Sequence, residues 1–405
     1  MRAAELLRVV AVPDFRKLWL IGLILSCGRW LEMLAVSVYV YQRTGSALLV
    51  SVVAVARFVP MGLFGAVIGA IAERVDRRGL LVLINSALFA SAVALAVLER
   101  SGMLQVWHLV LASFLSGISF TADFPVRRLM LGEVVGGDRV VTALAIDSTS
   151  GHGTRTVGPF IGGALLAAAG IGSVFLFQSV LYAGATVAAM RVRRRVRTSI
   201  ATHGSLIGGL REGWAICREE PRLIGILWLT VVFNVFCFPY LSMVAVIGAD
   251  ILHLDAARIG ILGSMDGLGA LLGALSVSVL IKRPQYERLF VGGVLVALGA
   301  LLPFALVGNA WLAGAALVVL GFAMAGFAVM QSTLIFLYSP AHARARTMGL
   351  LSMAIGFSPL GILLMGVLAD TFGPVLATTA MALAGFAVIV LTPRYWWALV
   401  RRPAR

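Results

Sequence analysis

Ionisable residues inside the long apolar runs of this 405-residue chain include Arg29, Glu32, Arg57, Arg155 and Asp266. If these runs cross a membrane, each charge costs roughly 2.5–3.5 kcal/mol on insertion scales. A guanidinium can bind an anion, and a carboxylate can pair with a cation or exchange a proton. The three-residue spacing predicts that Glu32 is the counter-charge of Arg29. We expect either a site for a polar or anionic substrate and a proton, or buried ion pairs that hold helices together.

Three further polar positions join this candidate set. Asp123 precedes Arg127 by four residues, which predicts a local ion pair that acts as a gate element. Asn234 and Gln331 lie in two later apolar runs, either facing a cavity or forming interhelical hydrogen bonds. The three cysteines form no C-x-x-C pair, so neither a metal site nor a disulfide framework is expected. No cofactor is expected.

The elements that must position these residues are twelve apolar runs, each near the roughly 20 residues that a membrane-spanning helix needs. Such a segment is read as a helix because the backbone must satisfy its own hydrogen bonds in lipid. The predicted spans are 18–41, 46–72, 80–98, 106–131, 143–168, 172–190, 222–247, 258–281, 288–307, 310–336, 347–369 and 374–393.

Basic residues alternate between the connectors of these runs. The chain has 33 Lys and Arg residues against 18 Asp and Glu, and 27 of the basic ones lie at the ends of the chain, in every second connector or at the span ends that adjoin it. The other connectors carry only Arg43, Arg100 and Arg258. Short loops rich in Lys and Arg stay in the cytoplasm, so both termini are predicted to be cytoplasmic. This sorting explains the net charge of +15 without a nucleic-acid partner.

The longest polar connector, residues 191–221, divides the chain into two parts. We expect a six-helix bundle over 1–190, a cytoplasmic linker with an amphipathic helix, and a second six-helix bundle over 222–405. Pro159 and Pro359 lie 200 positions apart in the fifth and eleventh runs, which suggests a repeat. The fold class is therefore an all-α membrane protein with two six-helix pseudo-repeats, a form typical of alternating-access carriers.

A motif follows the second run: Gly69, Glu73, Arg74, Asp76, Arg77 and Arg78. Its order resembles the G-x-x-x-D-R-x-G-R-R signature of the major facilitator superfamily, with Glu73 in the acid position and Asp76 where many members have Gly. The resemblance implies a gate at the cytoplasmic mouth. Glu73 would face the start of the eleventh span and a basic residue ending the fourth, Arg127 or Arg128. Arg344 and Arg346 complete the gating candidates.

Two glycine-rich segments resemble one branch of that superfamily, the enterobactin-exporter-like and macrolide-efflux-like carriers. They contain Gly158, Pro159, Gly162 and Gly163 in the fifth run, and Pro359 and Gly361 in the eleventh. Small residues allow close helix packing, and proline bends a helix.

The resemblance implies proton-driven export of a small amphipathic metabolite, siderophore or drug by a monomer in the bacterial inner membrane. An importer or flippase of a lipid-like substrate would keep the same fold. An intramembrane enzyme is the remote alternative, because no G-x-S-x-G or H-E-x-x-H motif is present. An ATP-driven motor is excluded, because neither lysine belongs to a phosphate-binding loop.

Overall fold

The computed structural model of the chain describes residues 3–74, 76–136, 139–193, 206–280, 285–340 and 343–400. Within these ranges the secondary structure is helical throughout, with no strand. Side chains are described except for 3–5, 64–74, 141, 206–210, 278–280 and 345. The all-helical fold expected from the apolar runs is confirmed.

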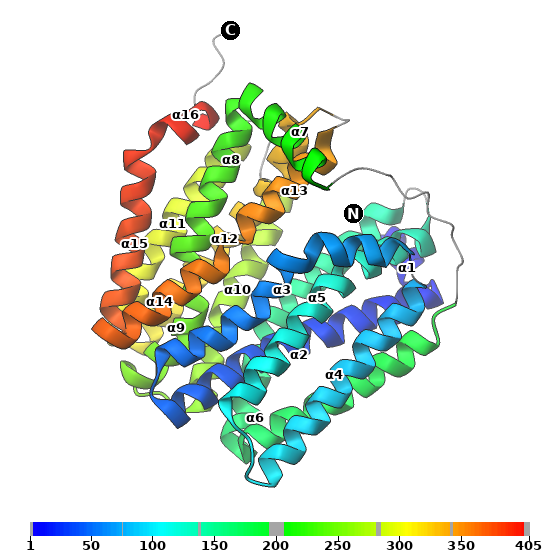
Figure 1. The fold of residues 1–405 in the computed structure, drawn as a ribbon, viewed down its shortest axis with the longest axis vertical. Helices are drawn as coiled ribbons and strands as arrows, with labels where there is room; N and C mark the ends of the chain where they lie inside the picture. The colour runs from blue at the N-terminus through cyan, green and yellow to red at the C-terminus, as the bar shows by residue number, and fades with distance from the viewer. Residues whose placement is uncertain are drawn as a thin grey trace.

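Six helices form the N-terminal half, drawn from blue to green in Figure 1. They are α1 (Ala3–Val10), α2 (Pro13–Thr44), α3 (Ala47–Arg74), α4 (Arg77–Arg100), α5 (Val106–Val135) and α6 (Val140–Met190). Proline begins α2, where its missing N–H costs nothing, and Gly45 ends it in the left-handed conformation at φ 64°.

Helix α6 is two helices joined by a sharp break. A straight helix of 51 residues would extend about 75 Å, more than twice the thickness of a bilayer core. Ala169 and Gly170 leave helical geometry, with Gly170 at φ 74°. The side chains of Trp19 and Lys17, near the start of α2, bond Ser150 Oγ and the Arg191 carbonyl oxygen. Both ends of α6 therefore lie beside the same end of α2, and the chain reverses direction at the break.

The C-terminal half follows a short helix, α7 (Leu206–Glu219), which packs against α13. Its elements are α8 (Pro221–Val232), the π-helix η2 (Phe233–Cys237), α9 (Tyr240–Asp250), α10 (Ala256–Leu280), α11 (Tyr286–Leu306), α12 (Ala310–Tyr338), α13 (Arg344–Ile355), α14 (Ser358–Phe372), α15 (Pro374–Leu391) and α16 (Pro393–Val400). The predicted seventh span is interrupted by η2, and the predicted eleventh is divided into α13 and α14.

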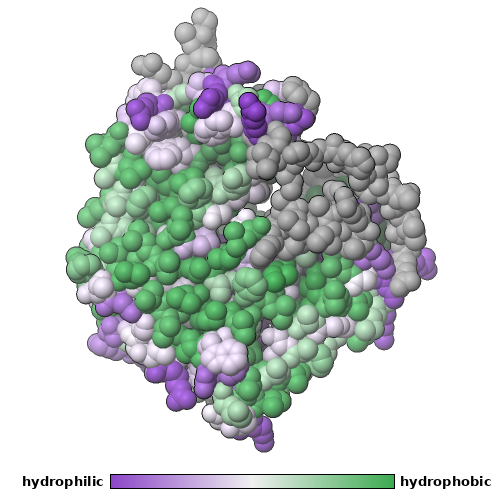
Figure 2. Space-filling model, viewed as in Figure 1, coloured by the Kyte–Doolittle hydropathy of each residue, from purple (hydrophilic) through white to green (hydrophobic). Residues whose placement is uncertain are grey.

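Ten helices of the described residues are long and apolar enough to cross a membrane, with the joined α6 counted once and α3 represented only by a shorter apolar stretch. Large apolar side chains such as Leu83, Leu176 and Val390 are exposed on the outside of the bundle. Figure 2 shows hydrophobic residues over a broad band and hydrophilic residues gathered toward the ends of the molecule. This distribution is that of a multi-pass membrane protein.

The two halves meet mainly through α6 against α10 and α3 against α14, and the helices of the halves are inclined to each other (Figure 1). Glycines allow the close approach of α6 and α10. A Cβ added to Gly163 would lie 2.7 Å from the Cα of Gly260, and one added to Gly267 would lie 2.4 Å from the backbone of Arg155. The backbones of the two halves are therefore in direct contact at this interface.

Candidate functional site

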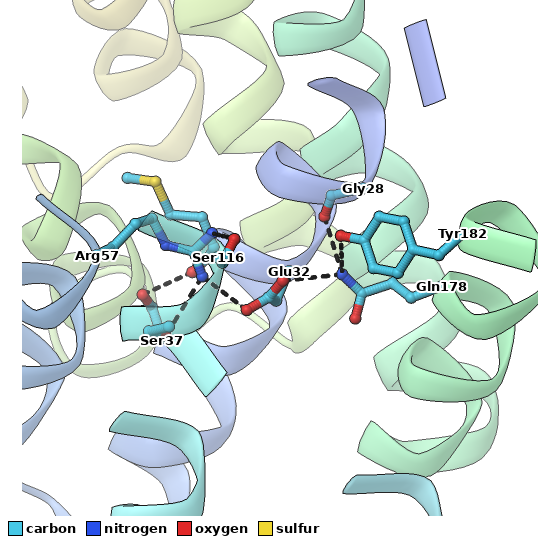
Figure 3. Close-up of polar contacts among 9 residues, drawn as sticks. Gly28, Glu32, Ser37, Arg57, Ser116, Gln178 and Tyr182 are labelled. Atoms are coloured by element: carbon cyan, nitrogen blue, oxygen red, sulfur yellow. Dashed lines mark hydrogen bonds and ion pairs between the residues drawn. The ribbon is translucent and has the colours of Figure 1, made fainter. Parts of the chain in front are cut away.

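A buried polar cluster lies inside the N-terminal half (Figure 3). Arg57 Nη2 of α3 lies 2.8 Å from Glu32 Oε1 of α2, and both side chains are almost fully buried. Arg57 also donates to Ser116 and Ser113 of α5, at 3.2 and 3.3 Å. Gln178 Nε2, from the second part of α6, donates to Glu32 Oε2 at 3.0 Å. The cluster joins four helices of one half and satisfies the carboxylate on both oxygens.

The predicted pairing of Glu32 with Arg29 is wrong. Glu32 turns toward α3 and α6, where Arg57 and Gln178 hold it. The Arg29 guanidinium instead lies over the ring of Phe120 on α5, with 3.9 Å between the guanidinium carbon and the ring centroid. A spacing of three residues places two side chains on neighbouring faces of a helix, and tertiary partners decided which way each one points.

A second ion pair joins the two halves. Arg155 of α6 contacts one carboxylate oxygen, Oδ2, of Asp266 on α10. Its Nε and its Nη2 each lie 2.7 Å from that oxygen. Arg155 also donates to the Tyr240 hydroxyl at 3.0 Å and lies 4.8 Å over the ring of Trp30. The other oxygen, Asp266 Oδ1, is buried without a hydrogen-bond partner among the described residues. Arg155 and Asp266, predicted separately from two apolar runs, therefore form one unit.

The Arg155–Asp266 pair lines a cavity between the halves. Trp30, Met33 and Pro159 contribute from the N-terminal half, and Leu241, Val244 and Gly263 from the C-terminal half. The cavity walls are mostly apolar, and a single ion pair supplies the charge, an arrangement typical of small-molecule sites.

A third charged cluster lies toward the far end of α5. The predicted pair is present, with Arg127 Nε 3.1 Å from Asp123 Oδ2. Arg127 also bonds Asp147 of α6, and Arg128 Nε lies 3.7 Å from the other oxygen of Asp147. Asp147 was not identified from the sequence, although its place in an apolar run was the signal that could have found it.

The signature connector is only partly described. The side chains of Gly69, Glu73 and Arg74 lie outside the described set, so the predicted contacts of Glu73 are not tested. Asp76 caps α4 by accepting from the backbone N–H of Arg78 at 3.2 Å. Arg77 Nη1 lies 2.6 Å from Glu133 Oε1 of α5, and Arg78 donates to the carbonyl oxygen of Met190.

The remaining gating candidates lie on α13. Arg346 pairs with Glu212 of α7 at 2.6 Å, and Arg344 lies 5.8 Å over the ring of Phe336. Arg346 therefore connects the short helix α7 to the C-terminal half.

Asn234 and Gln331 belong to a buried network inside the C-terminal half. Gln331 of α12 donates to the Thr230 hydroxyl at 2.8 Å. Asn234, in η2, donates to the carbonyl oxygen of Thr230 at 2.9 Å and accepts from Ser358 of α14 at 2.7 Å. Both amides thus form hydrogen bonds between helices, the second of the two roles considered for them.

The predicted packing residues lie at helix contacts. A Cβ added to Gly158 would lie 2.7 Å from Trp30 Cβ, and one added to Gly162 would lie 2.5 Å from the Leu31 carbonyl oxygen. This part of α6 therefore lies directly on α2. Gly361 touches the backbone of η2 at Val235 in the same way, at 2.3 Å. Pro159 is inside α6, and Pro359 is at the start of α14.

Comparison with known proteins decides the family. A family model of major facilitator superfamily carriers, described as transmembrane secretion effector, matches residues 8–398. The chain belongs to the major facilitator superfamily. It is 24% identical to the staphyloferrin A transporter of Staphylococcus aureus, over 91% of this chain and 92% of that one. It is 20% identical to macrolide efflux protein A of Streptococcus pyogenes, over 67% and 68% of the two chains.

Solved structures show the same fold. A POT family transporter in complex with 5-aminolevulinic acid superposes with a TM-score of 0.79 at 13% identity, over 96% of each chain. The superfamily and these relatives are transporters and not enzymes. Among the described residues no cluster of three or more His, Cys, Asp or Glu side chains could hold a metal ion.

Proposed function

We propose that this transporter exports a small amphipathic molecule by alternating access and is driven by proton entry. The chain would cross the membrane twelve times with both termini in the cytoplasm, as the sorting of basic residues favours. Its two bundles, up to residue 190 and from residue 222, would rock about the cavity between them. Relatives named for macrolide efflux and staphyloferrin A transport support a small-molecule cargo.

The Arg155–Asp266 ion pair carries this proposal. This pair connects the two halves at 2.7 Å, next to the cavity. The strength of the pair therefore depends on the relative position of the two halves. Protonation of Asp266 would remove the charge that holds Arg155 and would weaken the contact between α6 and α10. A proton could therefore bias the equilibrium between two conformations of the transporter.

Glu32 is the runner-up as the coupling carboxylate. All of its partners lie in the N-terminal half, on α3 and α6, and would move with it as one body. Its protonation would change the stability of that half more than the contact between halves. Asp266 Oδ1 also has no hydrogen-bond partner in the described part of the chain, so a proton could bind there without breaking a hydrogen bond.

The structure's contacts at the loop ends of α3 and α14 fit one state of such a cycle. Asp370, at the end of α14, accepts from Ser46 Oγ at 2.8 Å and from the backbone N–H of Leu48 at 3.0 Å. In the proposed topology this contact closes the outer face, opposite the termini. The conformation would then be one that can open only toward the cytoplasm.

The test is transport by purified protein in liposomes with an acidic lumen, with radiolabelled erythromycin and staphyloferrin A as probes. We expect the pH difference to drive accumulation of a probe in the lumen by the wild type. Asp266→Asn should abolish this accumulation and retain exchange of labelled for unlabelled probe. Asp255→Asn, on the exposed start of α10, is the matched control.

Four results would each contradict part of the proposal, three of them in transport and one in topology. Accumulation by Asp266→Asn at the wild-type rate would remove Asp266 from coupling, and loss of coupling only in Glu32→Gln would assign it to Glu32. Accumulation of neither probe would refute export of these two cargoes.

The proposed topology has its own test, which is labelling of introduced cysteines. Cysteines in place of Arg78 and Arg283 should react from the cytoplasmic side, and a cysteine in place of Arg258 should react from outside. Any other pattern would overturn the twelve-span arrangement.

A further inference from the structure

The inference below rests on the proposed transport function and concerns the class of substrate. The charges of the described membrane-embedded residues are almost all balanced. Arg57 is paired with Glu32, and Arg155 with Asp266. Arg127 and Arg128 share the two carboxylates of Asp123 and Asp147. Arg29 is left as one positive charge for which the described residues supply no ion-pair partner.

Arg29 also lacks hydrogen-bond partners among the described residues. Its Nε is buried and bonds no acceptor among the described residues. Among the described residues, the guanidinium is stabilised by the face of Phe120, at 3.9 Å, and by the more distant carboxylate of Asp123, with which it forms no ion pair. A cation–π contact is worth roughly 0.5–2 kcal/mol, less than an ion pair with hydrogen bonds in a low-dielectric interior. A lone guanidinium in this setting favours an external anion.

A cavity lies beside this guanidinium. It is lined by Arg29 and Leu25 of α2, Leu88 of α4, Ser119 and Phe120 of α5, and Tyr182 of α6. Apart from Arg29, the walls combine apolar surface with the hydroxyl groups of Ser116, Ser119 and Tyr182 and with the Asp123–Arg127 ion pair. The cavity therefore suits a ligand with an apolar body and one charged group.

A second charged residue limits the charge of that ligand. Asp123 lines the same cavity, and its Oδ1 is buried without a hydrogen-bond partner among the described residues. This carboxylate would repel a dianion, while the single excess charge of Arg29 is neutralised by one negative charge. The planar fork of a guanidinium matches a carboxylate with two parallel hydrogen bonds.

We propose that Arg29 binds the carboxylate of the substrate, and that the substrate is an amphipathic monocarboxylate whose apolar part packs against Phe120 and Leu25. The ligand completes the charge balance of the N-terminal half, so its arrival and departure change the electrostatics of the same bundle that contains Arg155. Ser116 connects the Arg29 cavity with the Glu32–Arg57 cluster, because it lines this cavity and accepts a hydrogen bond from Arg57.

Equilibrium binding tests this proposal without any transport. Purified full-length protein is titrated by calorimetry with 1-naphthoate and with its neutral counterpart 1-naphthamide. Wild type should prefer the carboxylate by about tenfold or more, the value of a charge-assisted hydrogen bond. Arg29→Gln should lose that preference by weakening naphthoate alone, and Arg29→Lys should retain part of it. Arg258→Gln, an exposed arginine on α10, should leave both affinities unchanged.

A second variant covers the case in which Arg29→Gln does not fold. Ser119→Asp would place a carboxylate in the cavity and supply the missing counter-charge within the protein. We expect this variant to unfold at a higher temperature than wild type and to lose naphthoate binding.

Three results would overturn the proposal: equal wild-type affinity for the two probes, no binding of naphthoate at all, or an undiminished preference in Arg29→Gln or Ser119→Asp. The assay has no pH gradient, so its outcome is independent of transport. With labelled naphthoate as the probe in the liposome assay, a binding preference without proton-driven accumulation would refute the proposed function alone. Accumulation without the preference would refute this inference alone.

Discussion

Glu32 and Arg57 show how a buried charge is made tolerable in this protein. Each is about 5% exposed, and the pair is completed by hydrogen bonds from Gln178 to the carboxylate and from Arg57 to two serines. A buried pair of this kind adds little net stability, because desolvation offsets most of the attraction. Removing one partner is different, since the other charge then remains buried without compensation.

This difference gives a prediction for the Glu32–Arg57 pair. Glu32→Ala should destabilise the protein by about 3–5 kcal/mol, because Arg57 keeps its charge in the interior. The double variant Glu32→Ala with Arg57→Leu should recover much of that loss. Thermal unfolding followed by tryptophan emission measures both. A double variant less stable than Glu32→Ala would show that Arg57 has another charge partner.

The same residues show what a sequence can and cannot predict about a site. The Asp123–Arg127 pair was predictable because four residues along a helix bring two side chains onto one face. The partners of Glu32 come from α3 and the second part of α6, 25 and 146 positions away. No local rule ranks such partners, so the expected pair with Arg29 was wrong, and Gln178 was not considered at all.

Among the elements, α6 and α10 meet through glycines, which leads to a prediction with an internal control. Gly267→Ala would place a Cβ 2.4 Å from the backbone of Arg155, so the helices must separate. We expect a loss of about 1–3 kcal/mol in thermal stability. Gly292→Ala, on α11, meets nothing within 4 Å and should be neutral or stabilising by up to about 1 kcal/mol. Equal effects of the two substitutions would contradict close packing at Gly267.

The short helix α7 offers a test based on a thiol outside the predicted spans. Burial raises the pKa of Cys217 from 9.0 to about 11, so the thiol is neutral and unreactive near neutral pH. In a variant with Cys27 and Cys237 replaced by serine, labelling with N-ethylmaleimide should be slow and should accelerate toward pH 11. Arg346→Glu, which repels Glu212, should speed labelling by loosening α7 from α13. Fast labelling of the parent protein would contradict a buried Cys217.

This pKa shift also has a consequence for stability. The folded protein holds the thiol proton more tightly than the unfolded chain does. The resulting stabilisation is complete below pH 9 and is lost as the pH rises through the folded value of about 11.

At the level of elements, hydropathy predicted most of the helices but not their interruptions. The break between the fifth and sixth spans was expected between 168 and 172, and the structure has it at Ala169 and Gly170. The π-helix at Phe233–Cys237 was not expected, because the surrounding run is almost wholly apolar and its hydropathy gives no sign of an extra residue in one turn. Pro239, two residues after its end, was the available signal.

For the whole molecule, the contacts between halves define which face is closed. Next to the contact of Asp370 with Ser46 and Leu48, Gly366 of α14 packs against Ser51 of α3. The Asp370 carboxylate accepts from the N–H of Leu48 at the start of α3, where the helix dipole also favours negative charge. Because α3 and α14 belong to different halves, this cap must break whenever that face opens.

The last prediction concerns the balance between the two conformations. A helix cap contributes about 1 kcal/mol and each further hydrogen bond about the same, so Asp370→Ala should raise the population open at that face by roughly tenfold or more. Spin labels at cysteines introduced for Ser101 and Gly308, in exposed loops of the two halves, report the separation of the halves. The longer distance should gain population in this variant.

Asp255→Ala is the matched control, because Asp255 caps α10 of its own half by accepting from Arg258 N–H at 2.8 Å. It removes the same kind of cap without a contact between halves, so its distance distribution should match that of the parent. An equal shift in both variants, or none in Asp370→Ala, would mean that closure of this face depends on the glycine contacts of α6 with α10 and of α14 with α3, and not on the carboxylate.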